Sequence, residues 1–245
     1  MLAGAPQLTL VGEIEGDRRA GRVDVAAAGH AGVLVVDTSN AASAPVAEWA
    51  LVLALLGLRQ HGRFRDIISG RQMSYADYKT DPPGRELTGK RVGMIGFGHI
   101  AWRLVELLRP FEVSVVAYDP YAPCELANAL AVDFAPLDTV MGCDVVVCTV
   151  PETPTSTGMI GAPEFARLPR DGVFVNVGRG PVVDLDALVA KARQGDAWFG
   201  VDVHDPEPIA VDSPLIGLRN VFLSPHIAGN TVEGLPGSSA SWSTR

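Results

Sequence analysis

An apolar run that ends in Gly-x-Gly-x-x-Ala constrains this chain more than any other feature. Val92-Gly93-Met94-Ile95 leads into Gly96-Phe97-Gly98-His99-Ile100-Ala101, and apolar residues then recur at helical spacing. The pattern predicts a strand, a tight turn and the start of a helix. Gly96 permits the turn, Gly98 lets a pyrophosphate approach the backbone, and the small Ala101 lets the helix touch the strand. The N–H groups and the positive dipole end of the helix would then face the phosphates.

An acidic residue at the end of the next expected strand supports this interpretation. Residues 113–118 have the apolar, β-branched composition of a strand, and Asp119 follows them, 21 residues after Gly98. A carboxylate here accepts hydrogen bonds from the ribose hydroxyls and repels a 2′-phosphate, so the expected cofactor is NAD rather than NADP. The alternative, which the spacing disfavours, is a glycine-rich turn followed by an unrelated aspartate.

Composition and charge exclude several classes of function. The chain has 245 residues, 47% of them hydrophobic, and a formal net charge of −8. The hydrophobic fraction is sufficient for a large core, and the acidic balance offers no basic face for nucleic acid or for an anionic membrane. The longest apolar stretch, residues 49–58, is too short to span a bilayer, and the N-terminus lacks a signal-peptide pattern. We therefore expect no nucleic-acid partner and no membrane partner.

The cysteines indicate a reducing environment. Cys124, Cys143 and Cys148 are odd in number and lack the spacing of metal ligands. We expect core or loop thiols in the cytoplasm and no metal site.

The first 42 residues predict the remnant of a second α/β domain. They hold two apolar runs, at 8–11 and 32–36, with a short helix expected at 23–28. Two strands do not make a stable domain alone, so we expect this segment to be the end of a substrate domain that is truncated at its N-terminal side.

Residues 43–58 predict an almost wholly apolar helix, with Ser43 as its N-cap and Pro45 in its first turn. Such a helix is usually buried against another layer or against a partner subunit, and we expect a homodimer. The polar residues 66–90 predict a surface connection.

From residue 91 onward, strand and helix patterns alternate, which predicts a doubly wound parallel α/β sheet of the Rossmann type. We place this NAD-binding domain at 43–228 and a flexible tail at 229–245. After the glycine-rich turn and the strand that precedes Asp119, we expect further strands at 144–149, 173–177, 198–201 and 221–223 and a helix at 185–194 that ends at Gly195.

Three residues that could do chemistry follow three successive strands. Arg179 lies between two glycines, Glu207 lies between two prolines, and His226 lies in Ser224-Pro225-His226-Ile227-Ala228-Gly229. Each alone is more simply read as an ordinary loop residue, but the three are expected at one edge of the sheet. A carboxylate near His226 would orient the imidazole and favour its protonated form. Arg179 would polarise a ketone and bind a neighbouring carboxylate.

These motifs, in this order and spacing, resemble the D-isomer-specific 2-hydroxyacid dehydrogenase family from about residue 7 to about residue 231. The resemblance implies that Arg179 binds and polarises the substrate, that His226 is the acid/base, and that Glu207 is its partner. It also implies reversible hydride transfer between NAD and C2 of a small 2-oxo acid. The expected cofactor-binding residues are Gly96, Gly98, His99, Ile100, Asp119, Val150, Pro151, Gly178, Asp202 and Gly229.

The chain departs from the family pattern at both ends. At ~30 residues per βαβ unit, on the order of 60 residues of the substrate domain are expected to be missing before the first strand. The segment 11–21, where the family binds the substrate carboxylate, is longer and more charged than the usual form. Residues 233–239 do not predict the helix with which the family continues. We expect the truncated sheet to expose an apolar edge and to favour self-association.

Two function hypotheses follow. The first is an NAD-dependent dehydrogenase of D-2-hydroxy acids, whose activity truncation could impair. The second is a non-enzymatic NAD-binding module, as in the corepressor relatives of this family, or an inactive truncated member. The acidic charge and the lack of an extension for binding partners favour the enzyme.

Overall fold

The computed structural model describes residues 5, 7–13, 23–37, 39–70 and 83–233. Its centre is a seven-stranded sheet in which every pairing is parallel, in the order β5-β4-β3-β6-β7-β8-β9. The strands are β3 (Arg91–Ile95), β4 (Ser114–Tyr118), β5 (Asp133–Phe134), β6 (Val145–Cys148), β7 (Val173–Asn176), β8 (Trp198–Val201) and β9 (Val221–Leu223). The predicted doubly wound parallel sheet is confirmed.

The central strands are continuously apolar because helices cover both faces of the sheet. Alternate residues of β6 and β7 contribute to two separate clusters: Val147 and Val175 pack on one face, and Val146 and Phe174 on the other. Each face therefore has its own core.

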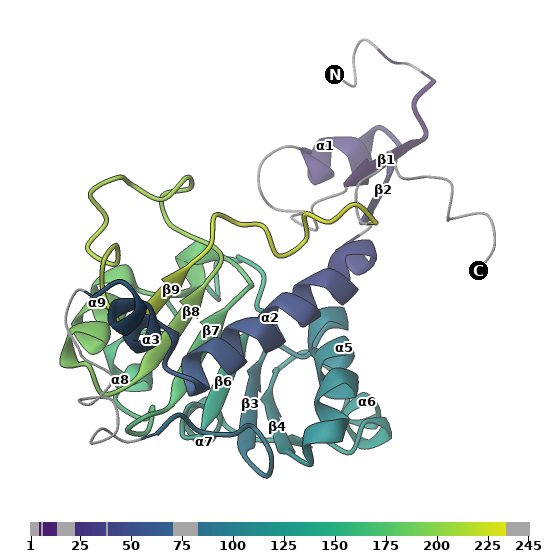
Figure 1. The fold of residues 1–245 in the computed structure, drawn as a ribbon. Coiled ribbons are helices and arrows are strands. Elements are labelled where there is room, and N and C mark those ends of the chain that lie inside the picture. Colours follow the sequence, from purple (N-terminus) through teal and green to yellow (C-terminus); the bar gives the residue numbers. More distant parts are fainter. Residues whose placement is uncertain (1–4, 6, 14–22, 38, 71–82, 234–245) are drawn as a thin grey trace.

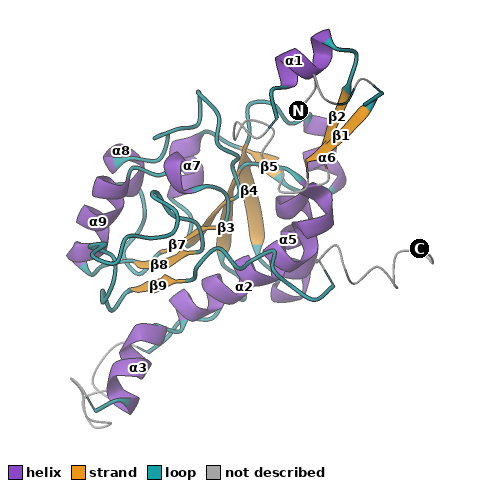
Figure 2. Ribbon diagram, turned by 90° about the horizontal axis from the view of Figure 1, so that it is seen from above, coloured by secondary structure: helices purple, strands orange, loops and turns teal. Residues whose placement is uncertain are grey.

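Helices α2 (Ser43–Leu58) and α5 (His99–Leu108) cover one face, and α7 (Leu137–Met141), α8 (Ala162–Phe165) and α9 (Leu185–Gln194) cover the other (Figure 2). Helix α2 packs on α5, β7 and β8 and crosses in front of the sheet in Figure 1. The other helices of the described part are α1 (Val25–His30), η2 (Ser39–Ala42), α3 (His61–Ile68), η3 (Arg109–Phe111), α6 (Cys124–Ala129) and η4 (Gly180–Val182).

Local signals determine where α9 begins and ends. The Asp184 carboxylate accepts a hydrogen bond from the backbone N–H of Ala187 and caps the helix N-terminus. Gly195 ends the helix with a φ of 71°, a left-handed conformation that glycine adopts without strain. The predicted helix at 185–194 is confirmed.

The first described segment forms a separate two-stranded parallel sheet of β1 (Leu10–Glu13) and β2 (Leu34–Asp37), which α1 connects. This unit lies apart from the large sheet (Figure 1). Leu10 and Leu34, which pair in register, are 51% and 59% exposed. An exposed apolar surface of this kind was expected from the sequence.

The predicted N-cap of α2 is wrong. The capping position is Ala42, and Ser43 is the first residue of the helix. The Ser43 hydroxyl donates to the backbone carbonyl of Asn40 and also lies 3.0 Å from the Asn40 side-chain oxygen. The short η2 helix before α2 explains the difference, because the chain is already helical when it reaches Ser43.

Helix α3 was not predicted, because its sequence is basic and contains Gly62. Tertiary contacts stabilise it: Arg219 pairs with Asp66 at 2.9 Å, and the His61 ring packs edge-on against Phe222. A Cβ on Gly62 would collide with the backbone carbonyl of Arg219, so the glycine permits the helix to lie against the segment before β9. Residues 71–82, within the expected surface connection, lie outside the described part.

Other expectations fall partly or wholly outside the described residues. Among them are most of the charged loop at 11–21 and residues 234–245 of the expected tail. The described part contains no helix long and apolar enough to cross a membrane.

We predict that one thiol per native chain reacts with an aromatic disulfide reagent and that three react after unfolding. Cys124 is exposed, whereas Cys143 and Cys148 are buried. Burial raises the pKa of the Cys143 thiol and raises the pKa of the Cys148 thiol to about 12, which suppresses the reactive thiolate. A second fast-reacting thiol in the native protein would contradict this packing.

Candidate active site

The residues singled out from the sequence lie in the loops that follow six neighbouring strands, or in the first turn of the helix after such a loop. In order across the sheet, Asp119 follows β4, Gly96–Ile100 follow β3, Val150 and Pro151 follow β6, Gly178 and Arg179 follow β7, Asp202 and Glu207 follow β8, and His226 and Gly229 follow β9. Because the strands are parallel, these loops share one edge of the sheet. The chain leaves β3 toward β4 on one side and later returns to β6 on the other, which makes a topological switch point between β3 and β6.

The glycine-rich turn has the geometry that a pyrophosphate requires. Gly96 has a φ of 85°, and Gly98 has no heavy atom within 4 Å of where a Cβ would stand. No side chain caps α5, as is also true of α2, α3, α6 and α7. The N-terminus of α5 therefore keeps backbone donors for an anion. Ala101 is fully buried, in agreement with the close helix–strand contact expected there.

Backbone amides hold the Asp119 carboxylate in place. One oxygen accepts from Phe97 at 2.8 Å, and the other accepts from Tyr121 at 2.8 Å and Ala122 at 3.1 Å. A carboxylate offers about four acceptor positions, so about one remains for a ribose hydroxyl. This geometry ties the end of β4 to the glycine-rich turn after β3.

The loop after β7 packs directly against its neighbours on both sides. A Cβ on Gly178 would stand 2.6 Å from the carbonyl oxygen of Val150, and one on Gly180 would collide with the backbone of His204. The glycines beside Arg179 thus permit backbone contact between three loops, which was not predicted from the sequence. Arg179 itself donates to the Gly178 carbonyl at 2.8 Å.

Asn176, which the sequence analysis did not assign a role, anchors this loop. Its side-chain oxygen accepts from the Gly178 N–H, and its amide nitrogen donates to the Arg179 carbonyl, both at 3.1 Å. It is buried at the last position of β7, and a polar residue at the end of an otherwise apolar strand was the available signal.

The structure brings His226 and Glu207 together. His226 Nδ1 lies 2.6 Å from Glu207 Oε1, and both side chains are about two fifths exposed, at 42% and 40%. Because a carboxylate only accepts, Nδ1 carries the proton, and Nε2 remains as the ring nitrogen for exchange with a bound molecule. The pairing expected from the sequence is therefore present.

Asp202 has a structural role at the same edge. It is fully buried, and its carboxylate accepts from the Ser224 hydroxyl at 2.5 Å and from the amides of Ile227 and Ala228 at 3.1 and 3.0 Å. The Asp202 carbonyl also accepts from the His226 amide at 2.7 Å. Asp202 thus binds the loop that carries the histidine, and its predicted cofactor contact stays a prediction.

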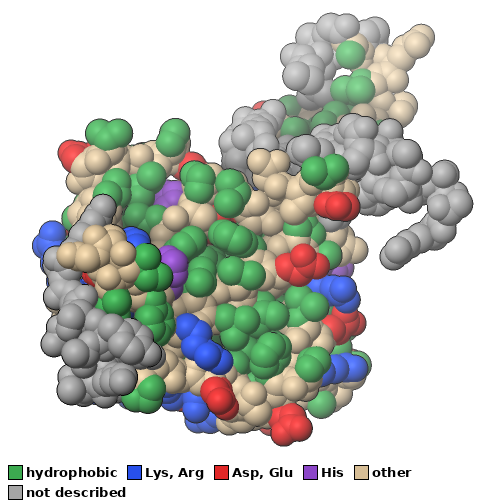
Figure 3. Space-filling model, in the orientation of Figure 1, with side chains coloured by type: hydrophobic (Ala, Val, Ile, Leu, Met, Phe, Trp, Pro, Cys, Tyr) green, Lys and Arg blue, Asp and Glu red, His purple; other side chains and the backbone are tan. Residues whose placement is uncertain are grey.

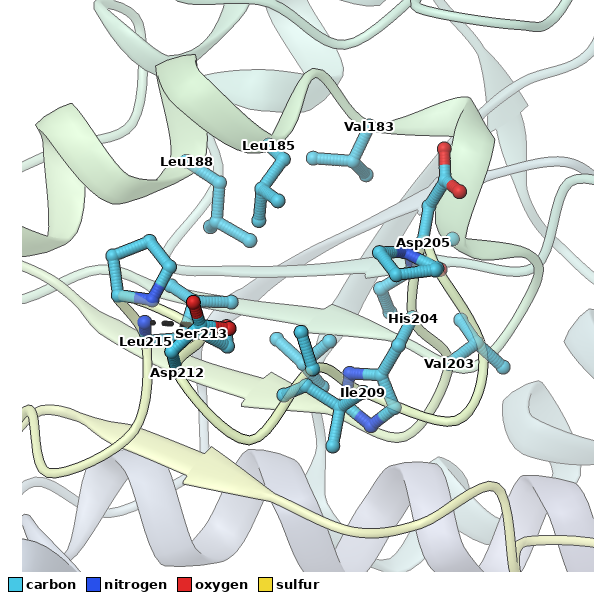
Figure 4. Close-up of a pocket in the computed structure, with 16 residues that line it drawn as sticks. Val183, Leu185, Leu188, Val203, His204, Asp205, Ile209, Asp212, Ser213 and Leu215 are labelled. Carbon is cyan, nitrogen blue, oxygen red and sulfur yellow. Dashed lines mark hydrogen bonds between the residues drawn. The ribbon is translucent and has the colours of Figure 1, made fainter.

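A cavity of about 200 Å³ lies between α9 and the loop that follows β8 (Figure 4). Leu185 and Leu188 line one side, and Leu215, Ile209 and His204 are among the residues that line the rest. Asn176 and Gly180 line part of this cavity, whereas Arg179, Glu207 and His226 do not, so it lies beside these three side chains rather than between them.

The model of the D-isomer specific 2-hydroxyacid dehydrogenase family, NAD binding domain, matches residues 50–228. The chain belongs to this family. The fold, the glycine-rich turn and the order of the loops agree with the assignment, and NAD is accordingly the cofactor of the domain.

Among the relatives, D-3-phosphoglycerate dehydrogenase of Archaeoglobus fulgidus is 33% identical over 214 residues, which cover 86% of this chain and 40% of that protein. D-3-phosphoglycerate dehydrogenase of Mycobacterium tuberculosis is 35% identical over 244 residues, covering 95% of this chain and 43% of that protein. The chain thus spans about two fifths of the length of these dehydrogenases.

Two solved structures superpose on most of the chain. D-lactate dehydrogenase of Aquifex aeolicus, in complex with NAD and lactic acid, is 25% identical, with a TM-score of 0.78. The match covers 95% of this chain and 73% of the chain of that enzyme. D-mandelate dehydrogenase of Rhodotorula graminis has a TM-score of 0.82 at 24% identity, and the match covers 94% of this chain and 68% of that one. At this identity the likeness supports only the assignment of the fold.

We predict that Gly180→Ala disrupts the candidate site more than it disrupts the fold. The added Cβ collides with the His204 backbone, so the loop after β8 must move away, and Glu207 with it. We expect Glu207 to separate from His226 in a crystal structure of the variant and the free energy of unfolding to fall by about 1–3 kcal/mol. Gly158→Ala, at an open position whose φ of 67° strains alanine, is the control for backbone strain alone. An unchanged Glu207–His226 contact in Gly180→Ala would contradict the account.

Proposed function

We propose that this chain forms the NAD-binding part, with the acid/base pair, of an NAD-dependent dehydrogenase that interconverts a small 2-oxo acid and a D-2-hydroxy acid. The observation that carries the proposal is the His226–Glu207 pair at 2.6 Å, on the same sheet edge as Arg179 and the glycine-rich turn. The family and its dehydrogenase relatives support the same reaction class.

Arg179, Glu207 and His226 each have a distinct role in the proposed reaction. Arg179 binds the substrate carboxylate and polarises the C2 carbonyl, for which a planar, permanently charged guanidinium is suited. His226 gives a proton to the carbonyl oxygen in reduction and removes it in oxidation, and Glu207 holds the imidazole with Nδ1 protonated. NAD, when bound, supplies or accepts the hydride.

The cofactor contacts follow from the loops that share the edge. We propose that the turn from Gly96 to Ile100 binds the pyrophosphate, that Asp119 accepts a ribose hydroxyl, and that the loops after β6 to β9 surround the nicotinamide. The residues of those later loops are Val150, Pro151, Gly178, Asp202 and Gly229. Support comes from the uncapped N-terminus of α5 and the open space at Gly98.

We propose the same division of the chain as before: a remnant of the substrate domain at 1–42, the NAD-binding domain at 43–228 and a tail at 229–245. The separate sheet of β1 and β2 supports the first boundary.

We also propose a cytoplasmic location, which the three free cysteines support.

We propose that the domain forms a homodimer through the outer face of α2. Glu48 is the one charged residue in this helix, and Leu51, Val52 and Leu55 are incompletely buried. Apolar side chains gather in the middle of the face where α2 crosses the sheet (Figure 3). A helix that is apolar all round usually packs on both sides.

The reaction is tested by following NADH oxidation with glyoxylate, hydroxypyruvate, pyruvate and phosphohydroxypyruvate. We expect turnover with at least one of them, and a loss of about 10²-fold or more in kcat for His226→Ala with an unchanged Kd for NADH. Glu207→Gln keeps a neutral acceptor beside Nδ1 and should lower kcat less than His226→Ala does. His30→Ala, at an exposed histidine of α1, is the control.

NADH binding without reduction of any 2-oxo acid would overturn the proposal and favour a non-enzymatic NAD-binding module. Equal turnover by the wild type and by His226→Ala would remove the histidine from the mechanism.

The dimer is tested by Val52→Glu, which places a charge on the outer face of α2. Val52 is 39% exposed in the single chain, so the change should leave the fold intact and convert a dimer into a monomer in sedimentation velocity. Val211→Glu, at a position that is 96% exposed and outside this face, is the matched control. A monomeric wild type, or a dimer that both variants retain, would contradict the proposed interface.

A further inference from the structure

We propose that Trp49 is a positioning residue for His226 and that it acts through Ser224 and Asp202. The kinetic consequence rests on the proposed dehydrogenase function, whereas the structural consequence does not. Trp49 lies on α2, 175 positions before Ser224 in the chain, and no sequence motif connects them.

The backbone at His226 requires support from its surroundings. Its φ is 54°, in the left-handed region that a residue other than glycine adopts only where neighbouring contacts hold it. His226 also lies in an exposed loop rather than in a helix or strand. The direction of the imidazole therefore depends on what binds this loop.

Asp202 provides that support at three consecutive residues. Its carbonyl accepts from the His226 amide, and its carboxylate accepts from the amides of Ile227 and Ala228. Asp202 immediately follows β8, so the histidine loop is tied to the neighbouring strand of the sheet. Any rotation of the carboxylate would loosen two of these three bonds.

Ser224 fixes the orientation of that carboxylate. Its hydroxyl is buried, has a single proton and donates it to Asp202 Oδ1 at 2.5 Å. The Ser224 carbonyl lies 2.8 Å from Nε2 of the buried His204, which holds the serine backbone as well.

Trp49 determines which way the Ser224 hydroxyl points. An indole N–H can only donate, and Trp49 Nε1 lies 3.1 Å from Ser224 Oγ, so it occupies an acceptor position on the hydroxyl. The hydroxyl proton is then directed to Asp202, and the successive bonds strengthen one another. The Trp49 ring packs edge-on against Phe222 of β9, which fixes the indole.

The test uses Trp49→Phe and Ser224→Ala, with amide hydrogen exchange of residues 225–229 as the first readout. Trp49→Phe keeps the aromatic contact with Phe222 and removes the N–H. We expect the amides of Ile227 and Ala228 to exchange about threefold to tenfold faster in each variant, as for the loss of one hydrogen bond. Amides of the central strand β6 should keep their rates, which separates loop positioning from a general loss of stability.

The second readout is kinetic. Each variant should lower kcat by about threefold to tenfold and change the KM for NADH by a smaller factor. Ser224→Thr keeps the hydroxyl and should restore both readouts. Trp198→Phe, a half-buried tryptophan at the opposite end of β8, is the control and should change neither.

Unchanged exchange at Ile227 and Ala228 in both Trp49→Phe and Ser224→Ala would overturn the proposal. Faster exchange throughout the domain would also overturn it, because Trp49 would then be a general packing residue. If the wild type reduces no 2-oxo acid, the dehydrogenase proposal fails, and hydrogen exchange still decides whether the chain of hydrogen bonds positions the loop.

Discussion

All seven strands of the central sheet run in the same direction, and the site depends on this constraint. Parallel strands need helical crossovers, and those crossovers cover both faces with apolar residues, so polar groups can gather only where the strands end. The loops after β4, β3, β6, β7, β8 and β9 consequently form one continuous edge. Glycines at 178 and 180 let neighbouring loops touch through their backbones, and the buried Asp202 carboxylate ties the last loop to the one before it.

Much of this architecture could be predicted from the sequence because local signals and tertiary structure agree. The run before Gly96 is apolar and β-branched, the turn needs glycine, and the helix after it has an apolar period, so each level favours the same strand–turn–helix unit. The order of Arg179, Glu207 and His226 after successive strands was sufficient to expect them at one edge. The contact between Glu207 and His226 then follows from the adjacency of β8 and β9.

The features that were not predicted depend on contacts between segments far apart in the sequence. Local sequence patterns contain no information about such contacts. The sequence of helix α3 does not favour a helix. Its contacts stabilise it: Asp66 pairs with Arg219, and His61 packs on Phe222. The role of the glycines beside Arg179 became clear only when the backbones of Val150 and His204 were placed beside them. The hydrogen bond between Trp49 and Ser224 joins two residues that no sequence motif connects. The hydrogen bond that the Asp119 carboxylate accepts from Phe97 depends on the geometry of the loops.

In the proposed mechanism, a guanidinium, an imidazole and its carboxylate partner meet beside the nicotinamide. A crystal structure of the protein with NADH and oxamate, an unreactive analogue of pyruvate, would show whether they do. We expect the Arg179 guanidinium and His226 Nε2 both to contact the oxamate, with donor–acceptor distances of about 3 Å, and the nicotinamide to lie on its other side. A nicotinamide bound away from this edge, or an oxamate that reaches only one of the two side chains, would contradict it.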